Sequence, residues 1–380
     1  MDSKLLEDFY THFGKKPVRQ FVAPGRINII GEHVDYLGGK VLPAAIHFSI
    51  NIIACRTSGS GYKLYSQAYN SLVQTDSPVH ETENTWANYI HGVVDEFQKR
   101  NLLIGGFEMA IGGNIPEGAG LSSSAALEVG VAFALNELFE LNLDKKALSL
   151  LAKDAENYFI GLQCGIMDQF ASAFGKENHC ILLDTASLQY EYHPAVFEGY
   201  ELFLIDSKVK HSLKDSAYNT RRKECDTALM KIREKYPEVQ TLYMAEEKHL
   251  EGTNLSPVEL KRVLHVIGER KRTINIVDSL SKNDILNVGK HILKAHASLS
   301  ELFEVSCPET DFLVNFLSNS GTVGARMIGG GFGGCVLAIE KTGEFSGKEA
   351  LLRKAYKDKF GIDLQIYNFR ITDGVREIGR

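Results

Sequence analysis

Gly112-Gly-Asn-Ile-Pro116-Glu-Gly118-Ala-Gly120-Leu-Ser122-Ser-Ser124-Ala-Ala-Leu-Glu128 is the most informative segment of this sequence. Small, turn-prone residues lead into three serines, and an apolar helical pattern follows them. Because glycine lacks a Cβ, such a loop can bring backbone N–H groups close to a phosphate. The helix behind it adds unpaired N–H donors and a partial positive charge. The segment therefore predicts an anion-binding loop at a helix N-terminus.

The hydroxyl groups of the three serines allow two interpretations. They can cap the helix, or they can bind a metal ion. A metal site would need a carboxylate nearby, and Glu156 and Asp168 are the candidates, on either side of a predicted helix end. Each of these carboxylates can equally be a surface or capping group, so the residues alone leave the choice open.

Length and composition limit the class of protein. The chain has 380 residues, 44% of them hydrophobic, and a formal net charge of -6. This length suits two domains better than one, and the negative charge argues against a nucleic-acid partner. We find no signal-peptide pattern and no apolar run of about 18 residues, so we expect a cytoplasmic protein with no membrane association. The six cysteines lack zinc-site spacing and predict reduced thiols.

Apolar periodicity predicts strands and helices in mixed order. Strands are expected over residues 21–30, 40–56, 102–111, 180–184, 200–206 and 363–369. Helices are expected over residues 2–13, 122–140, 145–159, 212–235, 256–271, 284–302, 309–317 and 348–360. Since they do not alternate strictly, the pattern favours an α+β fold over a doubly wound sheet. A change of pattern near residues 185–200 predicts a domain boundary.

A second glycine-rich segment lies near the end of the sequence, over residues 324–335. It contains the spacing G-x-G-x-x-G at Gly329, Gly331 and Gly334. A strand-like pattern follows it in place of a helix, so the context of a dinucleotide-binding fingerprint is missing. The glycines can also form a hairpin that lets two segments pack closely, and the pattern does not decide between binding and packing.

Four separated segments together resemble the GHMP small-molecule kinases, and the resemblance extends over almost the whole chain. Residues 24–36 resemble the signature of the members that phosphorylate galactose, and residues 116–126 resemble the family's ATP loop. Residues 164–169 resemble the segment with the catalytic aspartate, and residues 324–335 the C-terminal glycine-rich motif.

The sequence departs from this family at three positions. Members often carry Thr, Asn and Thr where this chain has Val34, Leu37 and Ile328. The first two lie beside the residues expected to bind the sugar. These differences therefore bear on the fine sugar preference more than on the kinase activity.

The resemblance implies a two-domain α+β architecture. Residues 1–195 would form a ribosomal S5 domain 2-like N-terminal domain, and residues 196–380 a ferredoxin-like C-terminal domain. The active site would lie in the cleft between them, and the last strand would return to the N-terminal domain.

The implied activity is ATP-dependent phosphorylation of the C1 hydroxyl of galactose, which yields galactose 1-phosphate. Transfer of a γ-phosphoryl group depends mainly on positioning and charge neutralisation. By resemblance, Asp168 would contact the C1 hydroxyl as general base, and Arg26 would stabilise developing negative charge. Mg²⁺ would accompany ATP, with Ser124 and Glu156 as its ligands.

The resemblance also implies which residues bind the two substrates. ATP phosphates are expected on Gly118, Ala119, Gly120, Leu121, Ser122, Ser123 and Ser124, and Ser66 is a further candidate to approach the nucleotide. The sugar is expected on Glu32, His33, Asp35, Gly165 and Tyr218. Within this set, Asp35 would engage the C3 and C4 hydroxyls, and Glu32 and His33 would approach C6. Gly165 would contribute its backbone, and Tyr218 would reach the sugar from the second domain.

Two alternatives stay open. One is a GHMP kinase for another galacto-configured sugar, such as N-acetylgalactosamine, galacturonate or arabinose. The other is a non-catalytic relative that senses galactose and ATP. The intact serines, Arg26 and Asp168 favour catalysis over sensing. The expected partners are a small sugar and Mg-ATP, and the oligomeric state, a monomer included, is left open.

Overall fold

The computed structural model describes residues 3–16, 18–210 and 214–379. Its strands are β1 (Arg19–Asn28), β2 (Lys40–Val41), β3 (Pro43–Arg56), β4 (Tyr62–Ser66), β5 (Ser71–Thr75), β6 (Phe107–Gly113), β7 (His179–Asp184), β8 (Tyr190–Pro194), β9 (Tyr200–Lys210), β10 (Gly324–Met327), β11 (Gly333–Lys341), β12 (Gln365–Asn368) and β13 (Arg376–Ile378). Its α-helices are α1 (Ser3–Phe13), α2 (Asn88–Lys99), α3 (Ser123–Phe139), α4 (Lys145–Asp154), α5 (Met167–Phe174), α6 (Lys214–Lys235), α7 (Pro257–Ser281), α8 (Ile285–Ser298), α9 (Pro308–Asn319) and α10 (Phe345–Phe360). Residues 2, 212 and 213 of the predicted helices lie outside the described residues.

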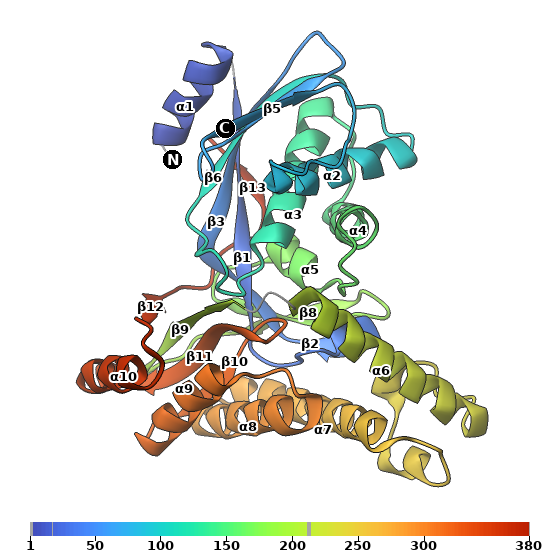
Figure 1. Cartoon of the computed structure of the whole chain (residues 1–380), viewed down its shortest axis with the longest axis vertical. Coiled ribbons are helices and arrows are strands. Elements are labelled where there is room, and N and C mark those ends of the chain that lie inside the picture. The colour runs from blue at the N-terminus through green and yellow to red at the C-terminus, as the bar shows by residue number, and fades with distance from the viewer. Residues whose placement is uncertain (1–2, 17, 211–213, 380) are drawn as a thin grey trace.

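The strands form an upper sheet with the order β13-β1-β3-β6-β4-β5 and a lower sheet with the order β10-β11-β9-β12 (Figure 1). A small sheet, β2-β7-β8, lies beside them. Sheets and helices are thus mixed without regular alternation. The predicted α+β fold is confirmed.

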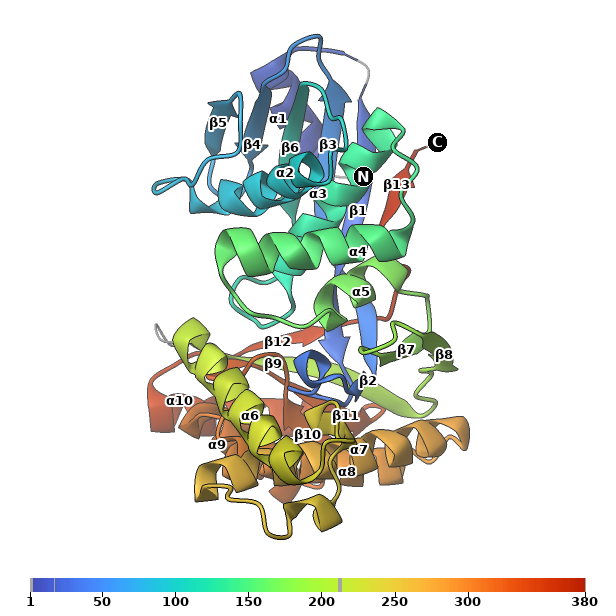
Figure 2. The same ribbon diagram turned by 90° about the vertical axis from the view of Figure 1, so that its right-hand side faces the viewer.

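Helices cover both faces of the upper sheet. Figures 1 and 2 show α3 against one face, with α2, α4 and α5 packed beside it, and α1 against the other. Helix α3 is buried over most of its length, because strands lie on one side of it and helices on the other. This double cover explains why its sequence is apolar almost all round.

The lower sheet is buried on both faces. In β9, Phe203 and Ile205 pack with apolar residues of α9 and α10. Leu204, which points to the opposite face, belongs to a different cluster that also holds Ile27 of β1 and Val288 of α8. The two halves of the molecule therefore share one hydrophobic core.

The C-terminus returns to the upper sheet. Strand β13 pairs antiparallel with β1, in the register Gln20↔Ile378 and Val22↔Arg376. In Figure 2 this last strand lies at the edge of the upper sheet, far from α10. The chain thus begins and ends in the same half.

Several predicted elements have different bounds in the structure. The strand expected over residues 102–111 begins only at Phe107. Leu103, which the apolar pattern placed in the strand, is 88% exposed, and the Gly106 N–H donates to the Gly59 carbonyl oxygen at 2.8 Å. The helix expected to end at residue 271 continues to Ser281. The helices expected over residues 145–159 and 284–302 both change to a π-helical turn in their last part, at Ala155–Ile160 and Leu299–Phe303.

All six cysteines lie within the described residues and are free thiols. Five of them are buried, and Cys164 is partly exposed. Among the helices of the described ranges, we find none long and apolar enough to cross a membrane.

Helix α8 packs against β10 with almost no side chain between their backbones, which yields a first prediction. A Cβ at Gly289 would lie 2.1 Å from the carbonyl oxygen of Val323. We expect Gly289→Ala to lower the free energy of unfolding by about 1–3 kcal/mol, as overpacking does. Urea unfolding measures this change.

Gly347 provides the matched control. It is an exposed residue of α10, and a Cβ there would meet nothing within 4 Å. Gly347→Ala should leave stability unchanged or raise it by about 0.5–1 kcal/mol. Equal unfolding midpoints for both variants would contradict the close approach of α8 and β10.

Candidate active site

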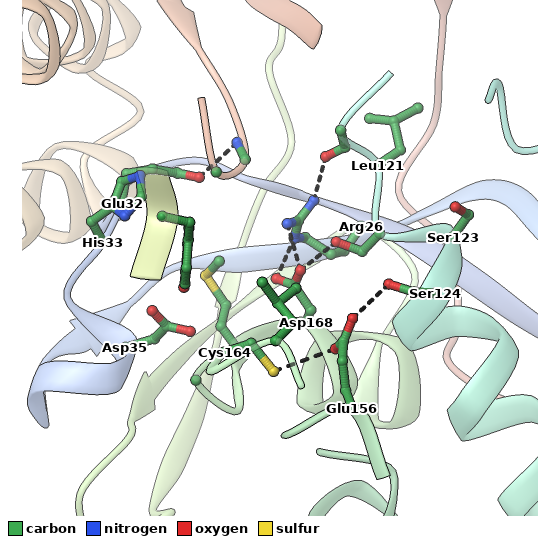
Figure 3. A pocket seen from close by; sticks show the side chains of 18 of the residues that line it. Arg26, Glu32, His33, Asp35, Leu121, Ser123, Ser124, Glu156, Cys164 and Asp168 are labelled. Atoms are coloured by element: carbon green, nitrogen blue, oxygen red, sulfur yellow. Dashed lines mark hydrogen bonds and ion pairs between the residues drawn. The ribbon is translucent and has the colours of Figure 1, made fainter. Parts of the chain in front are cut away.

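A cavity of about 230 Å³ lies where the upper and lower parts of the molecule meet (Figure 3). Its lining comes from β1 and residues 32–35 after it, from the loop before α3 and the first residues of α3, from residues 156–165 before α5, from α5 and α6, and from the hairpin between β10 and β11. The lining residues are Arg26, Glu32, His33, Asp35, Pro116, Gly118, Gly120, Leu121, Ser122, Ser123, Ser124, Glu156, Leu162, Cys164, Gly165, Met167, Asp168, Tyr218, Gly329 and Gly330.

The serine loop, residues 116–124, lies directly against the backbone of β1. The pairing of β1 with β3 is irregular between Pro24 and Arg26. At this bulge the Arg26 N–H donates to the Leu121 carbonyl at 3.2 Å. A Cβ at Gly25 would lie 2.6 Å from the same oxygen, so the approach requires glycine. The irregular strand therefore positions the loop.

Ser122 precedes the first turn of α3 but does not cap it. Its φ is 59°, a left-handed conformation that non-glycine residues seldom adopt, and its hydroxyl makes no capping hydrogen bond. The Ser122 hydroxyl instead donates to Oδ2 of Asp168. The first N–H groups of α3 are left uncapped by this side chain, as an anion site at a helix N-terminus requires.

Arg26 and Asp168 form a bidentate ion pair at the centre of the cavity (Figure 3). The Arg26 Nε and Nη2 atoms donate to Oδ1 and Oδ2 of Asp168, each at 2.7 Å. Arg26 Nη1 donates to the Gly120 carbonyl at 2.8 Å. The Arg26 side chain is only 4% exposed, against 30% for Asp168, so the carboxylate is the partner that reaches the open cavity. Paired N–H donors fix the orientation of this carboxylate.

Glu156 lies beside the first turn of α3, on the π-helical turn that follows α4. Its Oε1 accepts a hydrogen bond from the Ser124 hydroxyl at 2.9 Å. Its Oε2 accepts from Gln169 Nε2 at 2.6 Å and from the Cys164 thiol at 3.3 Å. Burial raises the pKa of Glu156, and the hydrogen bond from Ser124 opposes this change. A hydroxyl and a carboxylate thus present hard oxygen donors at one edge of the cavity.

Asp35 lies across the cavity from Ser124 and Glu156, in the signature loop (residues 31–36) (Figure 3). A Cβ at Gly165 would lie 2.1 Å from Asp35 Oδ2, so glycine is required for the carboxylate to sit here. Burial and the charge of Asp168 raise the pKa of Asp35 to about 7, although Arg26 lowers it. Four carboxyl groups therefore line the cavity, those of Glu32, Asp35, Glu156 and Asp168, and among its described lining residues Asp168 is the one paired with a cation that lines it too, Arg26.

His33 and Tyr218 form an aromatic wall of the cavity beside Asp35, and Tyr36 and Phe303 contact the His33 ring. The His33 ring lies 5.3 Å from Tyr218 and 4.8 Å from Phe303, measured between ring centroids. The Tyr36 hydroxyl lies 3.0 Å from His33 Nδ1. Burial lowers the pKa of His33 to about 3, so this imidazole is neutral. The wall presents flat, uncharged surfaces with polar edges.

The structure brings most of the residues singled out in the sequence to this cavity. Two do not line it: Ala119, whose side chain is buried in the core shared by both halves, and Ser66, which is buried at the end of β4. Leu162 lies outside the segments that the resemblance covers, and five other lining residues lie within them but had no role of their own in the sequence analysis, namely Pro116, Cys164, Met167, Gly329 and Gly330. The glycine spacing in the second glycine-rich segment was the available signal for the last two.

Models of known families match three parts of the chain. "GHMP kinases N terminal domain" matches residues 88–176, and "GHMP kinases C terminal" matches residues 276–357. "Galactokinase galactose-binding signature" matches residues 7–56, which include the signature loop.

Curated relatives match over nearly their full length. A galactokinase of Thermotoga petrophila is 44% identical over 359 residues, which cover 94% of this chain and 99% of the relative. A galactokinase of Clostridium beijerinckii is 38% identical and covers 99% of this chain and 98% of the relative.

Solved structures agree with these matches. The crystal structure of Lactococcus lactis galactokinase complexed with galactose matches with a TM-score of 0.93 and 33% identity, covering 98% of this chain and 99% of that one. A mevalonate kinase matches with a TM-score of 0.65 at 18% identity, covering 94% of this chain and 100% of the other, which shows the shared fold alone. The chain belongs to the galactokinases of the GHMP kinase family.

Proposed function

We propose that this chain transfers the γ-phosphoryl group of ATP to the C1 hydroxyl of galactose and releases galactose 1-phosphate. The observation that carries the proposal is the Arg26–Asp168 pair, which shares a cavity with both the serine loop and the signature loop. An oriented carboxylate can accept the proton of a hydroxyl nucleophile as it attacks. A guanidinium at the same point can stabilise the charge that develops on the transferred group.

ATP is assigned to the serine loop and the N-terminus of α3. Ser122, Ser123, Ser124 and the neighbouring residues Gly118, Ala119, Gly120 and Leu121 would surround its phosphates with backbone N–H groups and hydroxyls. We retain Ser66 as a proposed nucleotide contact beyond the cavity. Ser124 and Glu156 would hold Mg²⁺, because oxygen donors of this kind suit a hard cation. When bound, the ion would neutralise charge on the phosphate oxygens.

Galactose is assigned to the signature loop and the aromatic wall. Asp35 would accept hydrogen bonds from the C3 and C4 hydroxyls, and the absence of a side chain at Gly165 leaves the space that this carboxylate occupies. His33 and Glu32 would approach the C6 hydroxyl, and Tyr218 would close the site from α6. A carboxylate that binds two neighbouring hydroxyls can discriminate the C4 configuration, since an epimer leaves a buried acceptor unpaired.

The two-domain division at residues 195 and 196 also stays a proposal. It is supported by the start of the lower sheet at β9, just after this point. We also propose a cytoplasmic location, because the six free thiols suit a reducing compartment.

A sugar panel in a coupled ADP-release assay tests the proposed activity. Galactose, glucose, N-acetylgalactosamine, galacturonate and arabinose are compared, and NMR identifies the phosphorylated hydroxyl. Galactose should be the preferred substrate and C1 the phosphorylated position. Preference for an N-acetylated sugar, or no turnover with any sugar, would reject the assignment.

The role of Asp168 yields a second prediction. Asp168→Asn keeps the size of the side chain but removes the proton acceptor, so kcat for galactose should fall by about 1,000-fold or more. Binding of an ATP analogue, measured by calorimetry, should change little. Asp278→Asn, which removes an exposed ion pair with Lys282, is the control and should keep wild-type turnover. Turnover by Asp168→Asn close to wild type would exclude a catalytic role.

The raised pKa of Asp35 predicts a pH dependence of galactose binding. With a pKa of about 7, the carboxylate form that accepts hydrogen bonds from the sugar is scarce at pH 6 and dominant at pH 8. Galactose affinity should therefore rise about tenfold from pH 6 to pH 8, following the ionised fraction. Calorimetry without nucleotide measures it. In Asp35→Asn the affinity should be low and independent of pH, and a pH profile like that of the wild type would assign the titration elsewhere.

The raised pKa of Asp35 also predicts an effect of pH on protein stability, opposite in direction to its effect on galactose affinity. A carboxyl whose pKa is higher in the folded than in the unfolded state favours folding below its unfolded pKa, and this contribution is lost as the pH rises through about 7. Asp35→Asn removes the buried charge, so the melting temperature at pH 8 should rise by about 1–3 °C relative to wild type. At pH 5 the difference should shrink. A lower melting temperature of the variant at pH 8 would contradict this account.

A further inference from the structure

The carboxylate of Glu32, in the signature loop, accepts hydrogen bonds from three other parts of the structure. It is 2% exposed, and its Oε2 accepts hydrogen bonds from Asn28 Nδ2 at 2.7 Å and from Arg326 Nη1 at 2.9 Å. Its Oε1 accepts from the backbone N–H of Gly329 at 2.7 Å. Burial raises the pKa of Glu32, and the charges of Arg326 and Arg26 oppose this change. The side chain therefore joins β1, β10 and the hairpin that follows β10.

Arg326 is the cation that makes this burial possible. It lies on β10 and is fully buried. Besides Glu32, its guanidinium donates through Nη2 to the carbonyl oxygen of Asn28. A buried carboxylate without such a partner would be strongly destabilising. Arg326 does not line the cavity, so it acts on the site only through the groups that it holds.

The glycine hairpin, residues 328–334, connects Glu32 to the serine loop. Gly329 has a φ of 78°, and a Cβ there would lie 3.0 Å from the Gly120 carbonyl oxygen. On the far side of the hairpin, the Phe332 N–H donates to the Val305 carbonyl at 2.7 Å. Gly329 and Gly330 line the cavity itself. The tip of the hairpin is thus held between the loop assigned to the sugar and the loop assigned to the phosphates.

We propose that Arg326 is a positioning residue for phosphoryl transfer, because through Glu32 it fixes the tip of the glycine hairpin between the signature loop and the serine loop. This inference rests on the proposed function, which assigns one substrate to each loop. Loss of Arg326 would let the tip move relative to both loops. A displacement of about 1 Å between reacting groups can reduce turnover by about 100-fold.

The test compares Arg326→Met with a matched variant. Met keeps much of the length and apolar contact of the arginine stem but removes its charge and its donors. Lys348→Met is the control, because Lys348 pairs at 2.7 Å with the fully buried Glu340 of β11, in the same sheet but outside the cavity. Both variants break a buried ion pair, and only the first one releases the hairpin.

Two measurements distinguish a positioning role of Arg326 from an effect on protein stability alone. Amide hydrogen exchange of a peptide covering residues 328–334, in the substrate-free protein, should be about tenfold faster in Arg326→Met than in wild type or Lys348→Met. Steady-state kinetics should show kcat lowered by about 100-fold, with smaller changes in KM for ATP and for sugar. Lys348→Met should keep the wild-type kcat even if its melting temperature is lower than that of the wild type.

The proposal fails if Arg326→Met and Lys348→Met show the same exchange and the same kcat. If Arg326→Met does not fold, Arg326→Lys decides, since it keeps the charge but lacks the planar fork that reaches both Glu32 and Asn28. A folded Arg326→Lys with wild-type kcat and exchange overturns the proposal, and one with faster exchange and lowered kcat supports it. The exchange measurement needs no substrate, so it is independent of the sugar panel. A failure of the sugar panel would reject the proposed function and would leave the exchange result for Arg326 unaffected.

Discussion

The burial of one guanidinium against the backbone of the serine loop determines the arrangement of the whole cavity. Arg26 reaches from a bulged strand to the Gly120 carbonyl and to both oxygens of Asp168. With a side chain only 4% exposed, it can stay charged only because these acceptors surround it. The serine loop, the first turn of α5 and the strand β1 are therefore held in one mutual position. The geometry proposed for phosphoryl transfer follows from this constraint, since the reacting groups must be aligned before chemistry begins.

Negative charge is distributed unevenly around this cation. Asp168 has the ion pair and Glu32 has its own buried arginine, while Asp35 has no such partner among the residues that the structure describes. Burial and the charge of Asp168 raise the pKa of Asp35 to about 7, and burial also raises the pKa of Glu156, against the effect of the hydrogen bonds that it accepts. Asp35 and Glu156, which have no cationic partner within the described part of the chain, are the groups to which we assign exchangeable ligands, sugar hydroxyls at Asp35 and Mg²⁺ at Glu156. A permanent salt bridge at either place would compete with the ligand.

Sequence patterns predicted much of this arrangement because the patterns are local. The strand, glycines, serines and helix around Ser122 follow one another in the chain, so their order already implies a loop at a helix N-terminus. Contacts between distant segments were not accessible in this way. The hydrogen bond from Ser122 to Asp168 spans 46 residues, and the ion pair between Glu32 and Arg326 spans 294. The π-helical turn that presents Glu156 has the same apolar spacing as the α-helix before it, so periodicity extended that helix too far.

The return of β13 to β1 also has a consequence for the order in which the protein forms. The upper sheet contains Arg26 and packs against the helix that follows the serine loop, yet its last strand is made of residues 376–378. During synthesis from the N-terminus, β1 stays an edge strand without this partner until residues 376–378 have left the ribosome. Completion of the N-terminal half thus waits for the C-terminal half. The two halves cannot mature as independent units, although each has its own sheet.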